Sequence, residues 1–400
     1  MTLSHLFLAA IRLAPIPLLF AGLLSCDRLP REALTRCQAI TVVPPATKTD
    51  ILFVVDDSDS MTEEQQNLAD NFEAFIAKLE ASPFRGDYQI GITSTSVDLV
   101  ARSPSGSPFV NTVFQRGPNA GKPYPMGALI AVDPATGAYL PEGRRILAPG
   151  SPTLIEDFRN NIKVGVSGSG KEQGLLAARL AVTNRITDGT NEGFLRPGAR
   201  LAVIIVSDAD DCSDPDRQVV LDQNELCTSA TAKSRIKPVR DFVDALRQPL
   251  AGERRDVVVA VIGGVDPVTK LPSSSCAGLE DKADRYKEYV DQFPSAALID
   301  DICNPSFRGT LEQIAGLIEP PVSVTVEPAP TDPRLLSVRV VRANGTRVPC
   351  TVALPGDANP GAADAVYVPS EGTRAARIDL QNACRLARGD QLAVELLCAG

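Results

Sequence analysis

The chain has 400 residues, of which 44% are hydrophobic, 22% charged and 5% aromatic. This length and apolar content exclude disorder of the whole chain and predict roughly two or three domains. The 40 Lys and Arg residues against 49 Asp and Glu residues give a net charge of -9, which argues against binding to a nucleic-acid backbone.

The first residues have the pattern of an export signal. Arg12 is the only full charge before Asp27, and it precedes the apolar run Leu13–Leu24. As a helix this run would be about 18 Å long, too short for the ~30 Å hydrocarbon core of a membrane, so a signal peptide over residues 1–25 is predicted. The sequence Leu-Leu-Ser-Cys that ends at Cys26 resembles a bacterial lipobox. It implies a chain that starts at a lipidated Cys26 and is anchored in the bacterial envelope, on the outer membrane or the periplasmic face of the inner membrane. An ordinary secretory signal with an unrelated cysteine is the alternative.

Removal of the signal would also remove His5, the only histidine. The exported chain then has no Ser-His-Asp or Cys-His catalysis and no zinc site with a histidine ligand.

Eight cysteines remain after Cys26, and an even number in an exported chain predicts disulfides. Proximity in the sequence favours Cys212 with Cys227 and Cys276 with Cys303. The other four could close a C-terminal module and tie it to the N-terminal segment; they are Cys37, Cys350, Cys384 and Cys398.

Residues 26–46 are polar and contain Pro44 and Pro45, which is typical of a tether. The run Ile51–Val55 is then typical of a strand buried on both faces. Apolar residues at helical spacing predict a helix over Glu63–Ala81. Further elements follow, with strands predicted at Tyr88–Ser94, Leu201–Ser207, Asp256–Gly263 and Ala297–Asp300, and helices at Leu154–Ile162, Glu172–Val182, Ile236–Leu250, Leu279–Phe293 and Thr310–Leu317.

This alternation predicts a Rossmann-like, doubly wound α/β fold with a mainly parallel sheet over residues 47–319. Residues 96–152 are rich in Gly, Pro and Ser and predict an insertion with a hairpin around Ala128–Leu140. From residue 320 onward, short apolar runs alternate with turn residues. They predict a small all-β, sandwich-like domain over residues 320–400.

Oxygen-bearing side chains follow two of the predicted strands, at the edge where parallel α/β sheets bind ligands. Asp56, Ser58 and Ser60 come after the first strand, and Asp208 follows the run at Leu201–Ser207. Ser169 lies in a Ser-Gly-Ser-Gly loop between them. Two carboxylates and three hydroxyls form an oxygen-only set that suits Mg²⁺, or Mn²⁺ or Ca²⁺. The alternative is that Asp56 and the serines only cap the helix that follows.

The sequence DILFVVDDSDSM at residues 50–61 resembles the first motif of the von Willebrand factor type A (VWFA) domain, Asp-x-Ser-x-Ser after an apolar strand. Asp208 stands where this family has its aspartate, and Ser169 stands where it usually has threonine. The resemblance covers about residues 47–317. It implies a metal-ion-dependent adhesion site in which Ser58 and Ser60 bind the metal directly. Asp56 and Asp208 would bind it directly or through water, and Ser169 would join when a ligand is bound.

In this family the open metal position captures a carboxylate of a partner. The resemblance therefore implies a lipid-anchored envelope protein that binds a protein or extracellular-matrix ligand through a divalent cation and is not an enzyme. A second hypothesis is a type A scaffold with a degenerate metal site that serves only protein assembly. A hydrolase is the third, and without histidine its base would have to be an Asp or Lys.

Two further patterns are similar to sites for other ligands. Residues 165–171 fit the spacing G-x-x-x-x-G-K, but Glu172 stands where a phosphate-binding loop needs Ser or Thr, so no nucleotide site is predicted. The acidic segment 208–216 departs from the spacing of an EF-hand. A solvated loop held by Cys212 is favoured there over a second Ca²⁺ site.

Overall fold

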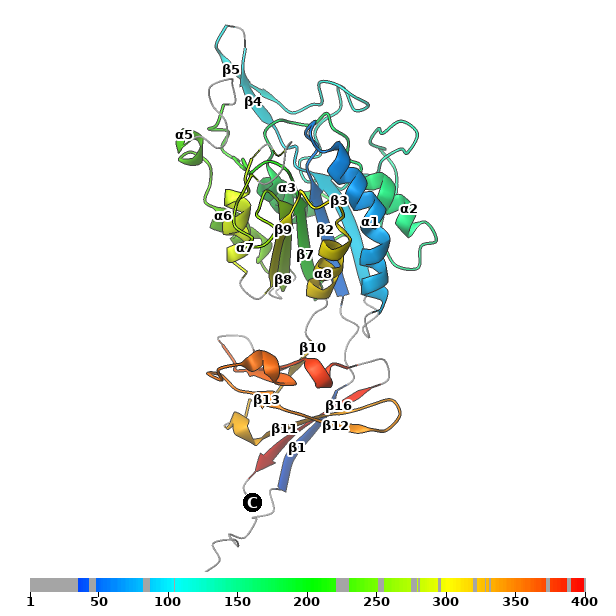
Figure 1. The fold of residues 1–400 in the computed structure, drawn as a ribbon, viewed down its shortest axis with the longest axis vertical. Helices are drawn as coiled ribbons and strands as arrows, with labels where there is room; N and C mark the ends of the chain where they lie inside the picture. The colour runs from blue at the N-terminus through cyan, green and yellow to red at the C-terminus, as the bar shows by residue number, and fades with distance from the viewer. Residues whose placement is uncertain are drawn as a thin grey trace, which may run out of the picture.

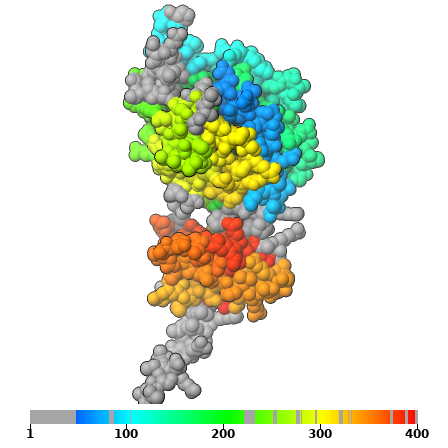
Figure 2. Space-filling view, viewed as in Figure 1, coloured from blue at the N-terminus to red at the C-terminus, as the bar shows by residue number. Residues whose placement is uncertain are grey.

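The computed structural model describes residues 35–42, 48–81, 87–103, 105–220, 230–250, 255–274, 279, 281–293, 296–318, 322–327, 329–330, 332–371, 375–386 and 390–398. Within these ranges the chain forms an α/β unit and a β module, which lie one after the other along the long axis of the molecule (Figure 1). Figure 2 shows the same two parts in space-filling form. The predicted signal peptide and Cys26 lie outside the described residues. None of the described helices combines the length and the hydropathy that a membrane crossing requires.

The α/β unit is built on a six-stranded sheet with the order β6-β3-β2-β7-β8-β9. Five of the strands are parallel, and the two-residue edge strand β6 is antiparallel. Every residue of β7 and β8 is buried, as expected for the continuous apolar runs of a parallel sheet covered on both faces. The strands are β2 (Lys48–Val55), β3 (Asp87–Ser94), β6 (Ile146–Leu147), β7 (Arg200–Val206), β8 (Val257–Gly263) and β9 (Ala297–Asp301).

Helices cover both faces of this sheet. Side chains alternate along β2, so that Ile51, Phe53 and Val55 pack into one apolar core while Leu52 and Val54 pack into the other. The first core is closed by α1 (Thr62–Ala81), α2 (Leu154–Asn161) and α8 (Arg308–Ile318), and the second by α3 (Gly174–Val182), α6 (Val239–Leu246) and α7 (Asp284–Asp291). Two short helices, α4 (Asn184–Thr187) and α5 (Ala230–Lys233), complete the unit. The prediction of a mixed α/β fold with a mainly parallel sheet is confirmed at this level.

Two predicted helices are shorter than expected at their N-terminal ends. The helix predicted from Ile236 begins at Val239 because Pro238 precedes it, and a residue before proline disfavours helical backbone. The helix predicted from Leu279 begins only at Asp284.

The insertion differs from the prediction in where its hairpin lies. The regular hairpin is formed by β4 (Leu99–Arg102) and β5 (Pro108–Asn111), which pair antiparallel. The predicted hairpin around Ala128–Leu140 is reduced to a single bridge between Val132 and Tyr139. The Gly, Pro and Ser content that marks the insertion does not locate the strands within it.

The β module consists of two four-stranded sheets, β1-β16-β11-β12 and β10-β15-β14-β13. Alternate residues of β11 are buried, and they share one apolar core with residues of β14 and β15 from the other sheet. This packing agrees with the predicted sandwich-like architecture. The strands are β1 (Thr35–Val42), β10 (Val322–Thr325), β11 (Leu336–Val341), β12 (Arg347–Cys350), β13 (Val352–Ala353), β14 (Ala365–Val368), β15 (Arg377–Leu380) and β16 (Gln391–Cys398), with 3₁₀ turns at Pro333–Leu335, Pro360–Ala362 and Asn382–Cys384.

The prediction that residues 26–46 form only a tether is wrong for residues 35–42. These residues form β1, which pairs antiparallel with β16, so the α/β unit is inserted between the first strand of the β module and the rest of it. The sequence of this strand, TRCQAITV, is rich in β-branched residues that favour strands. The two prolines that suggested a tether come after the strand, outside the described residues.

Disulfide-bonded cysteines are described in both the α/β unit and the β module. A bond joins Cys350 to Cys384, a pairing that the sequence left open. Cys212 and Cys303 are each in a disulfide. Their predicted partners Cys227 and Cys276 lie outside the described residues, so those two pairings remain predictions.

The pairing of β1 with β16 can be tested by removing β1 from the chain. A chain that begins at residue 43 should lose this edge of the sheet, expose the apolar side chains of β16 and show a β module with a Tm lower by several degrees. A chain that begins at residue 35 is the matched control and should unfold like the longer protein. Equal Tm values for the two chains would contradict the pairing.

Candidate functional site

The candidate site lies at the carboxyl ends of β2 and β7. The chain continues from β2 to β3 on one side and from β7 to β8 on the other, so the strand order reverses between β2 and β7. Open α/β sheets commonly bind ligands at such a reversal. The backbone N–H of Asp56 donates to Val206 O at 2.9 Å, which sets Asp56 beside Ser207 and brings Asp208 to the same edge. This edge faces away from the β module (Figure 1).

The first loop gathers three of the five predicted ligands. Asp56 is fully buried, and its Oδ1 accepts a hydrogen bond from the backbone N–H of Ser58 at 2.9 Å. Its Oδ2 accepts one from the hydroxyl of Ser207 at 2.5 Å. The hydroxyl oxygens of Ser58 and Ser60 lie 3.2 Å apart. Asp56, Ser58 and Ser60 are therefore assembled as the spacing of the motif predicts, and Asp208 directly follows the serine that binds Asp56.

Ser169 lies in a neighbouring loop with its hydroxyl turned elsewhere. Its backbone N–H donates to the Ser96 hydroxyl at 2.7 Å. Its own hydroxyl donates to the carbonyl oxygen of Asp98 at 3.0 Å and accepts from the Lys171 N–H at 3.1 Å. In this structure the hydroxyl of Ser169 thus serves contacts between loops rather than contacts with Asp56.

Asp57 joins these two loops. Its Oδ1 accepts a hydrogen bond from the Ser96 hydroxyl at 2.7 Å, and its backbone oxygen accepts one from the N–H of Gly168 at 2.7 Å. A Cβ atom at position 168 would lie 2.3 Å from the Asp57 carboxyl group, so only glycine fits there. Oδ2 of Asp57 is buried and has no hydrogen-bond partner among the described residues.

The electrostatics of Asp56 and Asp57 favour a cation. Burial raises the pKa of Asp57 to about 7, although the hydrogen bond from Ser96 lowers it. Burial likewise raises the pKa of Asp56, against hydrogen bonds from Ser207 and Ser58. In the described part of the chain, neither carboxylate forms an ion pair with a Lys or Arg side chain. A bound cation would favour the ionised forms and lower both pKa values.

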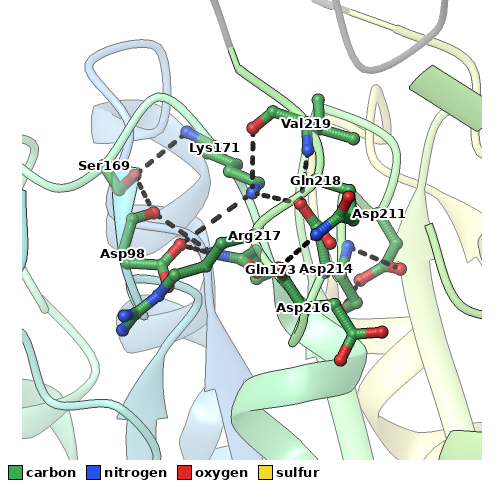
Figure 3. A network of polar contacts seen from close by, with 11 residues as sticks. Asp98, Ser169, Lys171, Gln173, Asp211, Asp214, Asp216, Arg217, Gln218 and Val219 are labelled. Carbon is green, nitrogen blue, oxygen red and sulfur yellow. Dashed lines mark hydrogen bonds and ion pairs between the residues drawn. The ribbon is translucent and has the colours of Figure 1, made fainter. Parts of the chain in front are cut away.

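The neighbouring acidic loop is neutralised by the protein itself, as Figure 3 shows for part of the network. Asp214 pairs with Lys171 at 3.0 Å and Asp98 with Arg217 at 2.8 Å. Asp211 pairs with Arg285 at 3.1 Å. The prediction of a solvated acidic loop is wrong, because four of its carboxylates are buried, namely those of Asp208, Asp210, Asp211 and Asp214.

Asp210 has a different partner. It accepts hydrogen bonds from the backbone N–H groups of Arg285 at 2.9 Å and Tyr286 at 3.4 Å, at the N-terminal end of α7. Burial raises the pKa of Asp210 to about 7, against these donors. The exposed N–H groups of a helix N-terminus commonly bind carboxylates, so this aspartate has a structural role.

In the described ranges, no group of three or more His, Cys, Asp or Glu side chains could by itself hold a metal ion. The candidate site instead offers Asp56 and Asp208 together with the hydroxyls of Ser58 and Ser60. This is a set with few carboxylates and several neutral oxygens, which fits a hard divalent cation that keeps some water ligands.

Several residues of the site were missed from the sequence. Thr95 and Ser96 follow β3 directly, and their hydroxyls reach Asp57. The rule that ligand-binding residues follow parallel strands applied to them as well. Gln65 donates from Nε2 to Asp56 O at 2.9 Å and to Gly165 O at 2.8 Å, which ties α1 to the middle loop. In the sequence, Gln65 could have been noticed as a polar residue among the apolar positions on the buried face of α1.

Comparisons with known proteins give little additional information. No family model matches the chain, and no curated protein matches it. One solved structure that matches is a crystal form of proximal thread matrix protein 1 from the mussel byssus, at 12% identity and a TM-score of 0.35. The match covers 77% of this chain and 51% of that chain, so this chain spans about half of that protein's length. A similarity at this level carries no argument about function.

The contact between Gly168 and Asp57 generates a matched pair of variants. Gly168→Ala should force the middle loop away from Asp57 and destabilise the α/β unit by about 1–3 kcal/mol, because the added methyl group has no room. Gly170→Ala is the control, since no atom lies within 4 Å of a Cβ at that position. Chemical denaturation measures both variants, and equal stability would show that the loop does not pack on Asp57.

Proposed function

We propose that the α/β unit is a VWFA domain whose metal-ion-dependent adhesion site binds Mg²⁺, or Mn²⁺ or Ca²⁺, through Asp56, Ser58, Ser60, Ser169 and Asp208. Through this cation the protein binds a carboxylate of a protein or extracellular-matrix ligand. The Asp-x-Ser-x-Ser motif at the end of β2 and the aspartate after the adjacent β7 support this proposal. The strand order, with a short antiparallel strand at one edge, supports it as well.

One observation carries the proposal: Asp56 and Asp57 are fully buried side by side without an ion pair among the described residues, next to the hydroxyls of Ser58 and Ser60. An ionised carboxylate in a protein interior is unstable unless it is paired or bound to a metal. In the adjacent acidic loop, Asp214 pairs with Lys171 and Asp211 with Arg285. A divalent cation would supply the missing positive charge at the first loop.

The ligand set also explains how a partner would bind. The two carboxylates would balance the charge of a divalent ion, and the hydroxyls are neutral ligands. The ion would keep a water-filled coordination position that a further carboxylate can take. Arg116, from the insertion, lies beside this loop and pairs with the exposed Asp59 at 3.2 Å. Its guanidinium adds positive charge at the rim, which favours an acidic ligand.

The placement of the site suits a protein anchored in the envelope. With a lipid on Cys26, the β module would come first from the membrane and the candidate site would lie at the far end of the α/β unit. The β module would then serve as a spacer. Binding rather than catalysis is the proposed activity.

A second candidate function is a scaffold with a degenerate metal site. The observation in its favour is Ser169, whose hydroxyl is engaged by Asp98 and Lys171 and does not contact the first loop. Metal binding by the other four residues distinguishes the two functions.

The metal site is tested by thermal unfolding with and without Mg²⁺. A ligand bound only by the folded state stabilises it by RT ln(1 + [L]/Kd), about 2.7 kcal/mol at a hundredfold excess over Kd, so Mg²⁺ should raise the Tm of chelated protein. Asp56→Ala and Asp208→Ala should each remove this rise. Asp59→Ala is the matched control, because this carboxylate lies in the same loop but is exposed. No rise in the unmodified protein would favour the scaffold.

The anchor is tested separately. Cys26→Ser removes the sulfur that would carry the lipid, so the variant should leave the membrane fraction and appear in the soluble fraction. Fractionation and immunoblotting measure this, with Cys37→Ser as the control cysteine. A Cys26→Ser variant that still sediments with membranes would contradict lipidation.

A further inference from the structure

The ammonium group of Lys171 lies in the protein interior, where it is surrounded by oxygen atoms. The side chain is fully buried, with its Nζ 3.0 Å from Asp214 Oδ2, 3.4 Å from the carbonyl oxygen of Val219 and 3.9 Å from Asp98 Oδ1 (Figure 3). Asp214 and Val219 belong to the loop after β7, and Asp98 follows β3. The lysine of the G-x-x-x-x-G-K pattern therefore faces inward, toward carboxylates, rather than outward toward a phosphate.

Other contacts hold these oxygen atoms in place around the ammonium group. Asp214 Oδ2 also accepts from the Val219 N–H at 2.7 Å, and the Asp214 N–H donates to Gln173 Oε1 at 3.1 Å. The Asp98 carboxylate accepts from Gln173 Nε2 at 3.0 Å and from Arg217 Nε at 2.8 Å. Oδ1 of Asp214 is buried and has no hydrogen-bond partner among the described residues.

Two carboxylates, a backbone carbonyl and one unused carboxylate oxygen form the type of ligand set that binds Ca²⁺. Here an ammonium group takes the central position. We infer that Lys171 is a built-in cation that fills what would otherwise be a second divalent-cation site, between Asp98, Asp214 and Val219. The acidic loop then keeps its structure without metal.

This arrangement also positions a residue of the proposed adhesion site. The Lys171 N–H donates to the Ser169 hydroxyl, and that hydroxyl donates to Asp98 O. Lys171 therefore fixes the backbone on both sides of Ser169. The inference about Lys171 does not depend on metal binding at Asp56.

The experiment uses the full chain with Asp56→Ala, so that the first site is removed. Adding Lys171→Met keeps the apolar part of the side chain and removes the charge. In chelator, this double variant should unfold about 10 °C below the Asp56→Ala protein, because the buried carboxylate of Asp214 loses its cation and Asp98 keeps only Arg217. Millimolar Ca²⁺ should restore most of that loss and leave the Asp56→Ala protein unchanged.

Two controls separate a cation site from a general loss of packing. Adding Asp214→Asn to the Lys171→Met variant removes one carboxylate, so it should recover stability in chelator and lose the response to Ca²⁺. Lys163→Met changes an exposed lysine before the same loop and should have no effect. A Lys171→Met protein with no Ca²⁺-dependent rise in Tm would overturn the inference.

A direct count of bound ions covers the case in which Lys171→Met does not fold. Equilibrium dialysis of Asp56→Ala against Ca²⁺ should find no ion at the Lys171 cluster. An ion that binds this protein and is lost on Asp214→Asn would also overturn the inference. Failure of the proposed adhesion site would appear elsewhere, as an unmodified protein whose Tm does not respond to Mg²⁺.

Discussion

Two neighbouring carboxylates have to be accommodated inside the protein where β2 ends, and the edge of the sheet is arranged around them. Asp56 turns toward β7 and binds Ser207, whereas Asp57 turns toward β3 and binds Ser96. The hydroxyl of Thr95 lies 3.4 Å from an oxygen of each carboxylate, so the pair draws loops from both neighbouring strands to one place. The close packing of Gly168 on Asp57 then adds the middle loop. Contacts with the carboxylates of Asp56 and Asp57 therefore hold the loops of the site together.

The same edge contains two solutions to the problem of buried acidic groups. In the loop after β7, Asp211 and Asp214 are paired with basic side chains that come from distant parts of the sequence, such as Arg285 of α7. Asp210 binds backbone N–H groups at the start of that helix. At the end of β2, hydrogen bonds from hydroxyls and backbone N–H groups stabilise the carboxylates of Asp56 and Asp57. Burial still raises the pKa of both aspartates. The first arrangement supplies basic partners for Asp211 and Asp214 from the protein itself. The second gains from an external ion, and this contrast separates a structural cluster from a candidate binding site.

The sequence predicts an element correctly where the pattern that indicates it lies within the element itself. Continuous apolar runs such as those of β2 and β7 predict buried strands, and the spacing of Asp56, Ser58 and Ser60 predicts that they share one loop. The sequence was insufficient where partners are remote. β1 pairs with a strand from the opposite end of the chain, so the β-branched residues of 35–42 alone did not show that a partner strand was present. The burial of the acidic loop depends on Lys171 and Arg285, and the direction of the Ser169 hydroxyl depends on Asp98. These are long-range contacts that spacing does not encode.

The inserted arrangement has a mechanical consequence. The chain enters the α/β unit after β1 and leaves it before β10, and these two strands belong to different sheets of the β module. A pull on a partner held at the far edge would therefore be divided between two covalent connections and would reach both layers of the sandwich. Along β1, such tension runs parallel to the strand, so the backbone hydrogen bonds to β16 would have to shear together instead of opening one at a time. The β module would therefore resist being pulled open along the direction of β1.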